Sequence, residues 1–119
     1  MKKYQVVGIG NAVVDVITQS TDTFLAEMGI AKGIMQLVET QRSEELFSAM
    51  DERVQTPGGS VANTIAGIGS LGLATGFIGR VRDDELGHFY ADAMTREGID
   101  FVNAPVAGGE LPTSRSMIF

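Results

Sequence analysis

A double-glycine turn is the part of the sequence whose residues are best suited to bind a ligand. Residues 57–64 read Pro-Gly-Gly-Ser-Val-Ala-Asn-Thr. Gly58 and Gly59 permit backbone angles with positive φ and place no Cβ between the main chain and a ligand. Ser60 is expected to cap the helix that follows, whose free N–H groups favour oxygen-rich ligands, and Asn63 lies in its first turn. A tight turn that leads into a helix and binds nothing is the alternative.

Two polar residues interrupt an apolar stretch near the N-terminus. Asn11 and Asp15 are four residues apart, so in a continuous strand both side chains point to the same face of the sheet. Burying such groups without partners costs about 1–3 kcal/mol each, so they either hydrogen-bond to neighbouring backbone or face a site. In a site, the Asp15 carboxylate can accept hydrogen bonds from two adjacent hydroxyl groups, which suits a sugar.

The glycines just before Asn11 resemble a dinucleotide-binding fingerprint only in part. Gly8 and Gly10 match its first two glycines, but Val13 occupies the position of the third. The β-branched residues over 12–17 also favour a continued strand, where the fingerprint requires a helix. A dinucleotide site, and with it a nicotinamide-dependent oxidoreductase, is therefore not predicted.

Charge and composition exclude several other classes of protein. The formal net charge of −6 disfavours a nucleic-acid-binding surface, which needs clustered Lys and Arg. The absence of cysteine excludes disulfides, thiolate catalysis and cysteine-ligated metals, and the single histidine, His88, is expected on the surface. No apolar stretch approaches the ~20 residues of a membrane span, and the N-terminus does not resemble a signal peptide. We therefore expect no membrane partner and a cytoplasmic location.

Apolar periodicity and turn residues predict strands that alternate with helices. The expected strands cover residues 4–9, 12–17, 34–38, 53–56, 74–79, 99–102 and 114–119. The expected helices cover residues 23–28, 40–50, 60–71 and 84–97, the first capped by Thr21 or Asp22 and the last by Asp83. This alternation predicts an α/β fold with a mainly parallel sheet and a separate small sheet.

Two further features of these elements carry expectations. Ala66, Gly67 and Gly69 lower the helix propensity of the third helix, and we expect them to allow its close packing on a sheet. The apolar strand at residues 116–119 is followed by no polar tail, so we interpret the chain as the front part of a longer polypeptide.

Four segments form an ordered set along the chain: residues 7–11 with Asp15, then 58–63, 79–87 and 112–114. Together they resemble the ribokinase-like (PfkB) family of carbohydrate and nucleoside kinases. The third segment resembles the family's Gly-x-Val-Gly-x-Asp-x-x-Gly run, although Arg82 stands in place of a glycine. Ser114 likewise stands where many members carry a glycine. Sequence details at residues 24–25, 35–39 and 59–60 resemble the adenosine-kinase-like branch.

The resemblance implies a ribokinase-like, Rossmann-type αβα sheet with a small β-sheet lid. It implies ATP-dependent phosphorylation of a primary hydroxyl group on a sugar or nucleoside. The substrate-binding residues that it implies are Asn11, Asp15, Gly58, Gly59 and Asn63. The lid strands would lie near residues 13–18, 54–57, 99–106 and 113–119, would exclude water from the reaction, and offer a surface for a homodimer.

The resemblance also implies what the chain does not contain. ATP and Mg²⁺ would bind mainly through a C-terminal part, whose Gly-Ala-Gly-Asp signature with the catalytic base is absent from these residues. We therefore expect no catalytic, cofactor-binding or metal-binding residue here, and no kinase activity from this segment alone. Arg115 either contacts phosphate or substrate or is a surface charge. The alternative function is a non-catalytic sugar- or nucleoside-binding or interaction module of the same fold.

Overall fold

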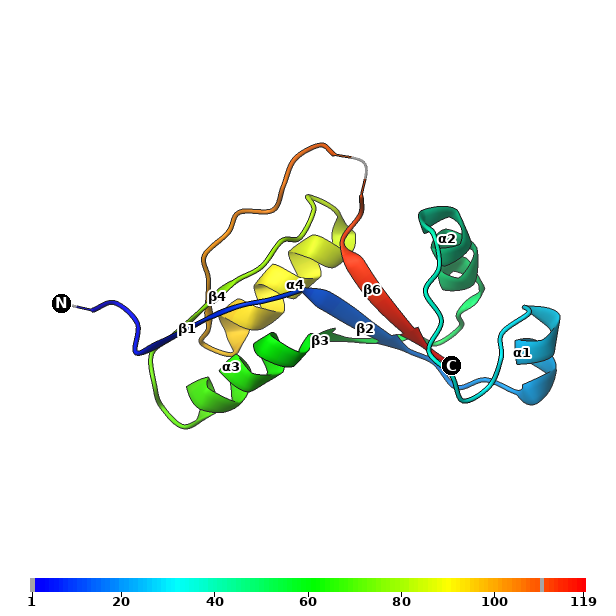
Figure 1. Cartoon of the computed structure of the whole chain (residues 1–119), viewed down its shortest axis with the longest axis horizontal. Coiled ribbons are helices and arrows are strands. Elements are labelled where there is room, and N and C mark those ends of the chain that lie inside the picture. Colours follow the sequence, from blue (N-terminus) through cyan, green and yellow to red (C-terminus); the bar gives the residue numbers. More distant parts are fainter. Residues whose placement is uncertain (1, 110) are drawn as a thin grey trace.

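The computed structural model describes residues 2–109 and 111–119, which form two small β-sheets with helices packed against them (Figure 1). In chain order the elements are β1 Val6–Ile9, β2 Val13–Ile17, α1 Asp22–Glu27, α2 Thr40–Ala49, β3 Val54–Gly58, α3 Ser60–Ser70, β4 Thr75–Ile78, α4 Glu85–Arg96, β5 Asp100–Phe101 and β6 Ser114–Ile118. The molecule is elongated, 56 × 32 × 21 Å, with the first sheet near the N-terminus and α1 and α2 at the opposite end (Figure 1). The predicted α/β class is confirmed.

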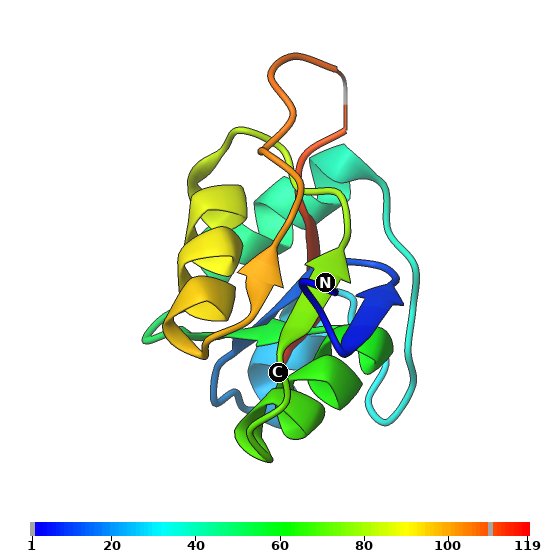
Figure 2. The same ribbon diagram turned by 90° about the vertical axis from the view of Figure 1, so that its left-hand side faces the viewer.

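The first sheet contains three parallel strands in the order β1-β4-β5, seen side by side in Figure 2. Gly8 lets α3 approach β1, because a Cβ there would lie 2.7 Å from a side-chain carbon of that helix. On the same face, Phe77 of β4 packs against Tyr90 of α4 with ring centroids 6.4 Å apart. Helices α3 and α4 therefore cover one face, while Val7 and Ile9 on the other face are 49% and 73% exposed.

The second sheet places β2 between β3, its antiparallel neighbour, and β6, its parallel neighbour. Val14 and Val16 of β2 are fully buried, so one face of this sheet belongs to the hydrophobic core. The opposite face carries Asp15, which is aligned with Thr56 of β3 and Ser116 of β6. Because directly aligned residues share a face, a row of three polar side chains crosses this open face.

Residues 99–106 do not add the expected fourth strand to the second sheet. β5 instead pairs with β4 in the first sheet. Its Phe101 packs edge-on against Phe77 and Tyr90, at centroid distances of 6.0 and 5.6 Å, and these aromatic contacts hold it there. Val106 forms an isolated parallel bridge with Arg82. The prediction of a lid strand over 99–106 is therefore wrong.

The predicted strand over residues 34–38 is also wrong. The segment is an irregular connection between α1 and α2, and Ile34, Met35 and Leu37 are 64%, 82% and 86% exposed. An apolar run becomes a strand only where another strand offers it a hydrogen-bonding partner. Within the part of the chain that the structure describes, this segment has no such partner.

The N-cap residues predicted for three helices agree with the structure in one case and shift by one residue in the two others. Thr21 caps α1 by accepting a hydrogen bond from the N–H three residues later, at 3.1 Å. Gly59 rather than Ser60 is the N-cap of α3, with a φ of 101° that favours glycine. Asp84 rather than Asp83 caps α4, accepting from the N–H three residues later.

The small residues of α3 allow close packing at only some positions. A Cβ on Gly69 would lie 3.2 Å from the hydroxyl oxygen of Thr75 in β4, so this glycine permits the contact between helix and sheet. Ala66 is half-buried against the core. A Cβ on Gly67 would meet open space, so the packing role predicted for this glycine is wrong.

Candidate substrate site

Asp15 lies directly over the first glycine of the turn. A Cβ on Gly58 would lie 2.5 to 2.7 Å from the three carboxylate atoms of Asp15, so only glycine leaves room for this side chain. The strand pairing explains the proximity, because Val13 of β2 is aligned with Gly58 at the end of β3 and Asp15 follows two residues later on the same face. The Asp15 side chain is half-buried, beside buried Gly58, and its carboxylate oxygens are hydrogen-bond acceptors.

Asn11 approaches the second glycine through its main chain. Its carbonyl oxygen would lie 2.5 Å from a Cβ on Gly59, so this position too requires glycine. The structure starts β2 at Val13, so Asn11 precedes the strand instead of sharing it with Asp15 as predicted. Its side chain is exposed. Asp15, Gly58, Gly59 and the backbone of Asn11 therefore meet at one place.

Asn63 joins this group through its backbone. Its N–H donates to the carbonyl oxygen of Gly59 at 2.9 Å, which closes the first turn of α3. Its side chain lines a neighbouring hollow of about 180 Å³ between β3, α3 and α4, together with Thr56 and Glu97. The lining of this hollow includes Pro57 of the turn but not Asp15, Gly58 or Gly59, so the Asn63 amide lies outside the group that Asp15 forms with the two glycines.

Tyr90 of α4 contacts the turn from the core. Its ring is fully buried, and its hydroxyl donates to the carbonyl oxygen of Gly58 at 3.0 Å. Burial, with smaller contributions from the negative charges of Asp15 and Glu97, raises the pKa of Tyr90 to about 12. From the sequence, Tyr90 was predicted only to lie within the helix over residues 84–97, with no role in the site. The available signal was that a buried tyrosine hydroxyl needs a hydrogen-bonding partner.

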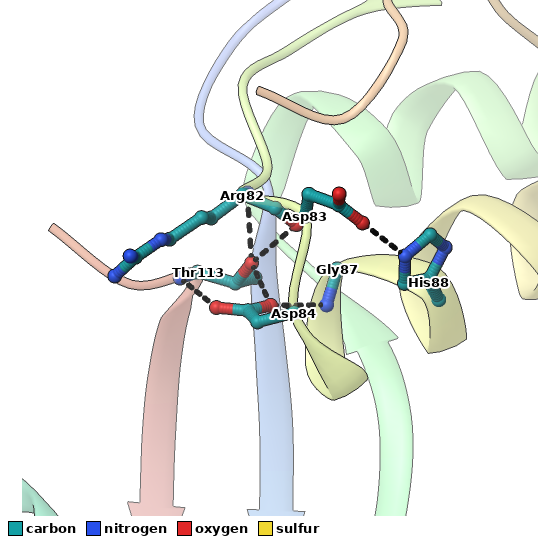
Figure 3. Close-up of polar contacts among 6 residues, drawn as sticks. All are labelled: Arg82, Asp83, Asp84, Gly87, His88 and Thr113. Atoms are coloured by element: carbon teal, nitrogen blue, oxygen red, sulfur yellow. Dashed lines mark hydrogen bonds and ion pairs between the residues drawn. The ribbon is translucent and has the colours of Figure 1, made fainter. Parts of the chain in front are cut away.

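The motif over residues 79–87 fixes the start of α4 to the start of β6 (Figure 3). The carboxylate of Asp84 accepts hydrogen bonds from the N–H of Gly87 at 2.8 Å, and from the N–H and hydroxyl of Thr113 at 2.9 and 2.6 Å. The hydroxyl of Thr113 in turn accepts from the N–H of Arg82 at 2.9 Å. Gly87 is required because a Cβ there would lie 1.9 Å from a carbonyl oxygen. The motif is thus a structural junction beside the site.

The charge of Asp84 is stabilised by this junction. Burial opposes its ionisation, but the hydrogen bonds from Thr113 and Gly87 and the positive charge of Arg82 outweigh burial. The pKa of Asp84 is therefore lowered from its usual value. His88, expected on the surface, is exposed, and its Nε2 lies 2.5 Å from a carboxylate oxygen of Asp83 (Figure 3).

Arg115 is a link between β6 and α2. Its Nε donates to the hydroxyl of Ser43 at 2.9 Å, and its terminal nitrogen lies 2.8 Å from a carboxylate oxygen of Glu44. The guanidinium also lies 4.3 Å from the ring centroid of Phe47, and the side chain is only 9% exposed. Neither of the two roles considered for Arg115 from the sequence, a surface charge or a contact to substrate, describes this buried structural link.

The described residues offer no metal centre. Within residues 2–109 and 111–119, no group of three or more histidine and carboxylate side chains is placed to hold a metal ion. In the same part of the chain, no helix is long and apolar enough to cross a membrane.

Comparison with known proteins identifies the family to which this chain belongs. Residues 22–119 match the pattern of the pfkB family carbohydrate kinases. The structure of an adenosine kinase from Sinorhizobium meliloti is 44% identical, with a TM-score of 0.80 over 98% of this chain and 35% of that one. A probable sugar kinase from Rhizobium etli CFN 42 is 36% identical, with a TM-score of 0.78 and the same two coverages. A 5-dehydro-2-deoxygluconokinase from Bacillus licheniformis is 32% identical over 99 residues, 83% of this chain and 24% of that protein.

The chain belongs to the pfkB family of carbohydrate kinases, as its motifs predicted. Its fold is that of the ribokinase-like adenosine kinase structures. It spans 35% of the length of these two solved structures and 24% of the Bacillus licheniformis protein.

Proposed function

We propose that this chain is the substrate-binding part of a kinase that transfers a phosphoryl group from ATP to a primary hydroxyl of a sugar or nucleoside. The observation that carries the proposal is the position of Asp15 over the Gly58-Gly59 turn in a member of this family. A carboxylate beside a turn without Cβ atoms offers acceptors and open backbone on the same side.

The proposed contacts follow from hydrogen-bonding chemistry. The Asp15 carboxylate accepts from adjacent hydroxyl groups of the substrate, and such charge-assisted bonds are the strong ones. The backbone of Gly58 and Gly59 contacts the substrate, and Gly59 is the N-cap of α3, where the helix dipole favours electron-rich oxygen. The exposed amides of Asn11 and Asn63 complete the set from either side of the turn. Each of these contacts holds the substrate so that its reacting hydroxyl keeps one orientation.

We propose that the second sheet acts as the lid of this site. Asp15, Thr56 and Ser116 form a polar row on its open face, next to the turn. A sheet that covers the substrate from this side excludes water, so that the phosphoryl group passes to the substrate hydroxyl and not to solvent. Strands β2, β3 and β6 make this lid, without the residues over 99–106.

We place the ATP and Mg²⁺ sites outside the residues described here. No metal-holding group of side chains occurs among residues 2–109 and 111–119, and the sequence lacks the Gly-Ala-Gly-Asp run. We assign both, and the catalytic base, to the remaining two-thirds of a complete family member. ATP and Mg²⁺ bound there would supply the phosphoryl group and neutralise charge during its transfer. This chain contributes binding, orientation and the exclusion of water.

The test uses the protein expressed from the complete reading frame, here called the complete protein. Asp15→Ala should lower kcat/KM about 100-fold on the best substrate of a panel of sugars and nucleosides, as expected for losing about 3 kcal/mol of charge-assisted hydrogen bonding. Asp92→Ala, on the exposed side of α4, is the matched control and should retain activity. Unchanged kinetics in Asp15→Ala would remove Asp15 from the site. Ligand binding without consumption of ATP across the whole panel would instead favour the non-catalytic module.

A further inference from the structure

Tyr90 touches the proposed site without facing the ligand. Its ring is wedged edge-on against Phe101, with centroids 5.6 Å apart at 83°, and lies 6.4 Å from that of Phe77. No part of the residue is exposed, so these rings hold it in one place. Its hydroxyl, at the end of this rigid group, donates to the carbonyl oxygen of Gly58. A buried side chain of α4 therefore restrains the direction of that carbonyl, in addition to the pairing of Gly58 with Val13 in the sheet.

The direction of this carbonyl sets the direction of the next N–H. The peptide bond between Gly58 and Gly59 is trans, like every described peptide bond, so its C=O and N–H point in opposite directions. With the carbonyl held by Tyr90, the N–H of Gly59 is directed away from the aromatic cluster. A double-glycine turn has more backbone freedom than any other dipeptide, so such an orientation needs an external restraint.

We propose that Tyr90 is a positioning residue, which orients the Gly58-Gly59 peptide so that its N–H is available to a substrate hydroxyl beside Asp15. The inference rests on the proposed function. Two properties support it. The Asp15 carboxylate lies over the same Gly58, so one glycine joins the acceptor of the site to the restraint from the core. The high pKa of Tyr90, about 12, keeps its hydroxyl protonated, and therefore a donor, over the working pH range of the protein.

The kinetic consequence differs from that of a catalytic group. A backbone N–H that holds a substrate hydroxyl contributes alike to the bound substrate and to the transition state, so its loss raises KM and leaves kcat nearly unchanged. Tyr90→Phe removes the hydroxyl and keeps the ring packing. In the complete protein this substitution should raise KM about three- to tenfold, the range of one neutral hydrogen bond, with kcat within about twofold of the wild-type value.

The chain provides a matched control in its other tyrosine. The hydroxyl of Tyr4 donates to Asp100 at the start of β5, away from the turn. Tyr4→Phe removes one phenolic hydrogen bond in the same way and should leave KM unchanged. Equal values of KM in Tyr90→Phe and Tyr4→Phe would overturn the inference.

A set of substrate analogues, each lacking a single hydroxyl, separates positioning from general loosening of the fold. If Tyr90 acts through one substrate hydroxyl, Tyr90→Phe and the wild type should have the same KM for the analogue that lacks it. A structural role would instead raise KM equally for every analogue, and that result would refute the proposal. Asp15→Ala, measured in parallel, separates a failure of the proposed function from a failure of the inference on Tyr90. Unchanged kinetics in Asp15→Ala would contradict the proposed function itself. An effect in Asp15→Ala with none in Tyr90→Phe would contradict only the inference.

Discussion

The junction between Asp84 and Thr113 gives the sharpest stability prediction. Thr113 is 2% exposed, and both its N–H and its hydroxyl donate to the carboxylate of Asp84, which also caps α4 through Gly87 (Figure 3). Asp84→Ala removes all three acceptor contacts at once. Asp84→Asn keeps a good N-cap residue, but an NH₂ group replaces one of the two carboxylate oxygens. The side chain can then no longer accept hydrogen bonds from both the N–H and the hydroxyl of Thr113.

The two substitutions should differ by the value of the cap. Loss of an N-cap costs about 1 kcal/mol, and loss of the hydrogen bonds between buried Thr113 and a charged acceptor costs about 2 kcal/mol. We therefore expect the free energy of unfolding to fall by about 3 kcal/mol in Asp84→Ala and by about 2 kcal/mol in Asp84→Asn. Asp83→Ala is the matched control, since Asp83 is exposed and its pair with His88 contributes less than about 1 kcal/mol.

Urea denaturation of the complete protein, followed by circular dichroism, measures these changes. Combining Asp84→Ala with Thr113→Val closes a double-mutant cycle, whose coupling energy should exceed about 1 kcal/mol because each substitution removes the partner of the other. A coupling energy near zero would refute the reasoning, as would a loss in Asp84→Ala no larger than that in Asp83→Ala.

Three further predictions concern the turn, the pH dependence and the link to α2. Gly59→Ala should lower the free energy of unfolding, measured by urea denaturation, by at least about 2 kcal/mol and abolish turnover, because φ is 101° and the new Cβ would meet the carbonyl of Asn11. Gly67→Ala is the control: its Cβ meets open space, so it should raise the free energy of unfolding by about 0.5–1 kcal/mol. The pKa of Asp84 is lowered in the folded protein, so its charge stabilises the fold above the unfolded pKa of about 3.9, and this stability is lost as pH falls through the folded pKa. The difference in free energy of unfolding between wild type and Asp84→Asn should therefore shrink below about pH 4 in an acid titration. Arg115→Lys should cost about 1.5 kcal/mol of stability but leave KM within about twofold, and a large rise in KM would return Arg115 to the substrate site.

Local pattern was sufficient where the predicted element also found its partners in the fold. The buried strand β4 and the amphipathic helix α4 were predicted because their apolar periodicity specifies both the type of element and the face it buries. Residues 34–38 show the limit of this reasoning, since an apolar run does not reveal whether a partner strand exists. Residues 99–106 show a related limit: a strand was expected there, but the choice between two sheets depends on aromatic contacts of Phe101 that lie far apart in sequence.

The residues of the candidate site also differ in whether the sequence could predict them. Gly58 and Gly59 could be predicted because their value to a ligand is a property of the backbone itself. The role of Tyr90 could not be predicted, because its position on the apolar face of a helix does not reveal which group its hydroxyl contacts. Arg115 lies more than seventy residues from its partners Ser43 and Glu44 in the sequence, and no spacing rule connects them.

The second sheet is attached to the rest of the molecule at several places, and disturbing them should affect the candidate site to different extents. Tyr90 holds the end of β3, and Asp84 holds the residue before β6, so both attachments come from α4. Arg115 attaches β6 to α2, on the buried face opposite Asp15. Because Asp15 stands on β2 between the two strands that α4 holds, a change in α4 shifts the carboxylate and the glycine turn together. A change at Arg115 moves a surface helix instead, and this difference separates the expected effects of Tyr90→Phe and Arg115→Lys on KM.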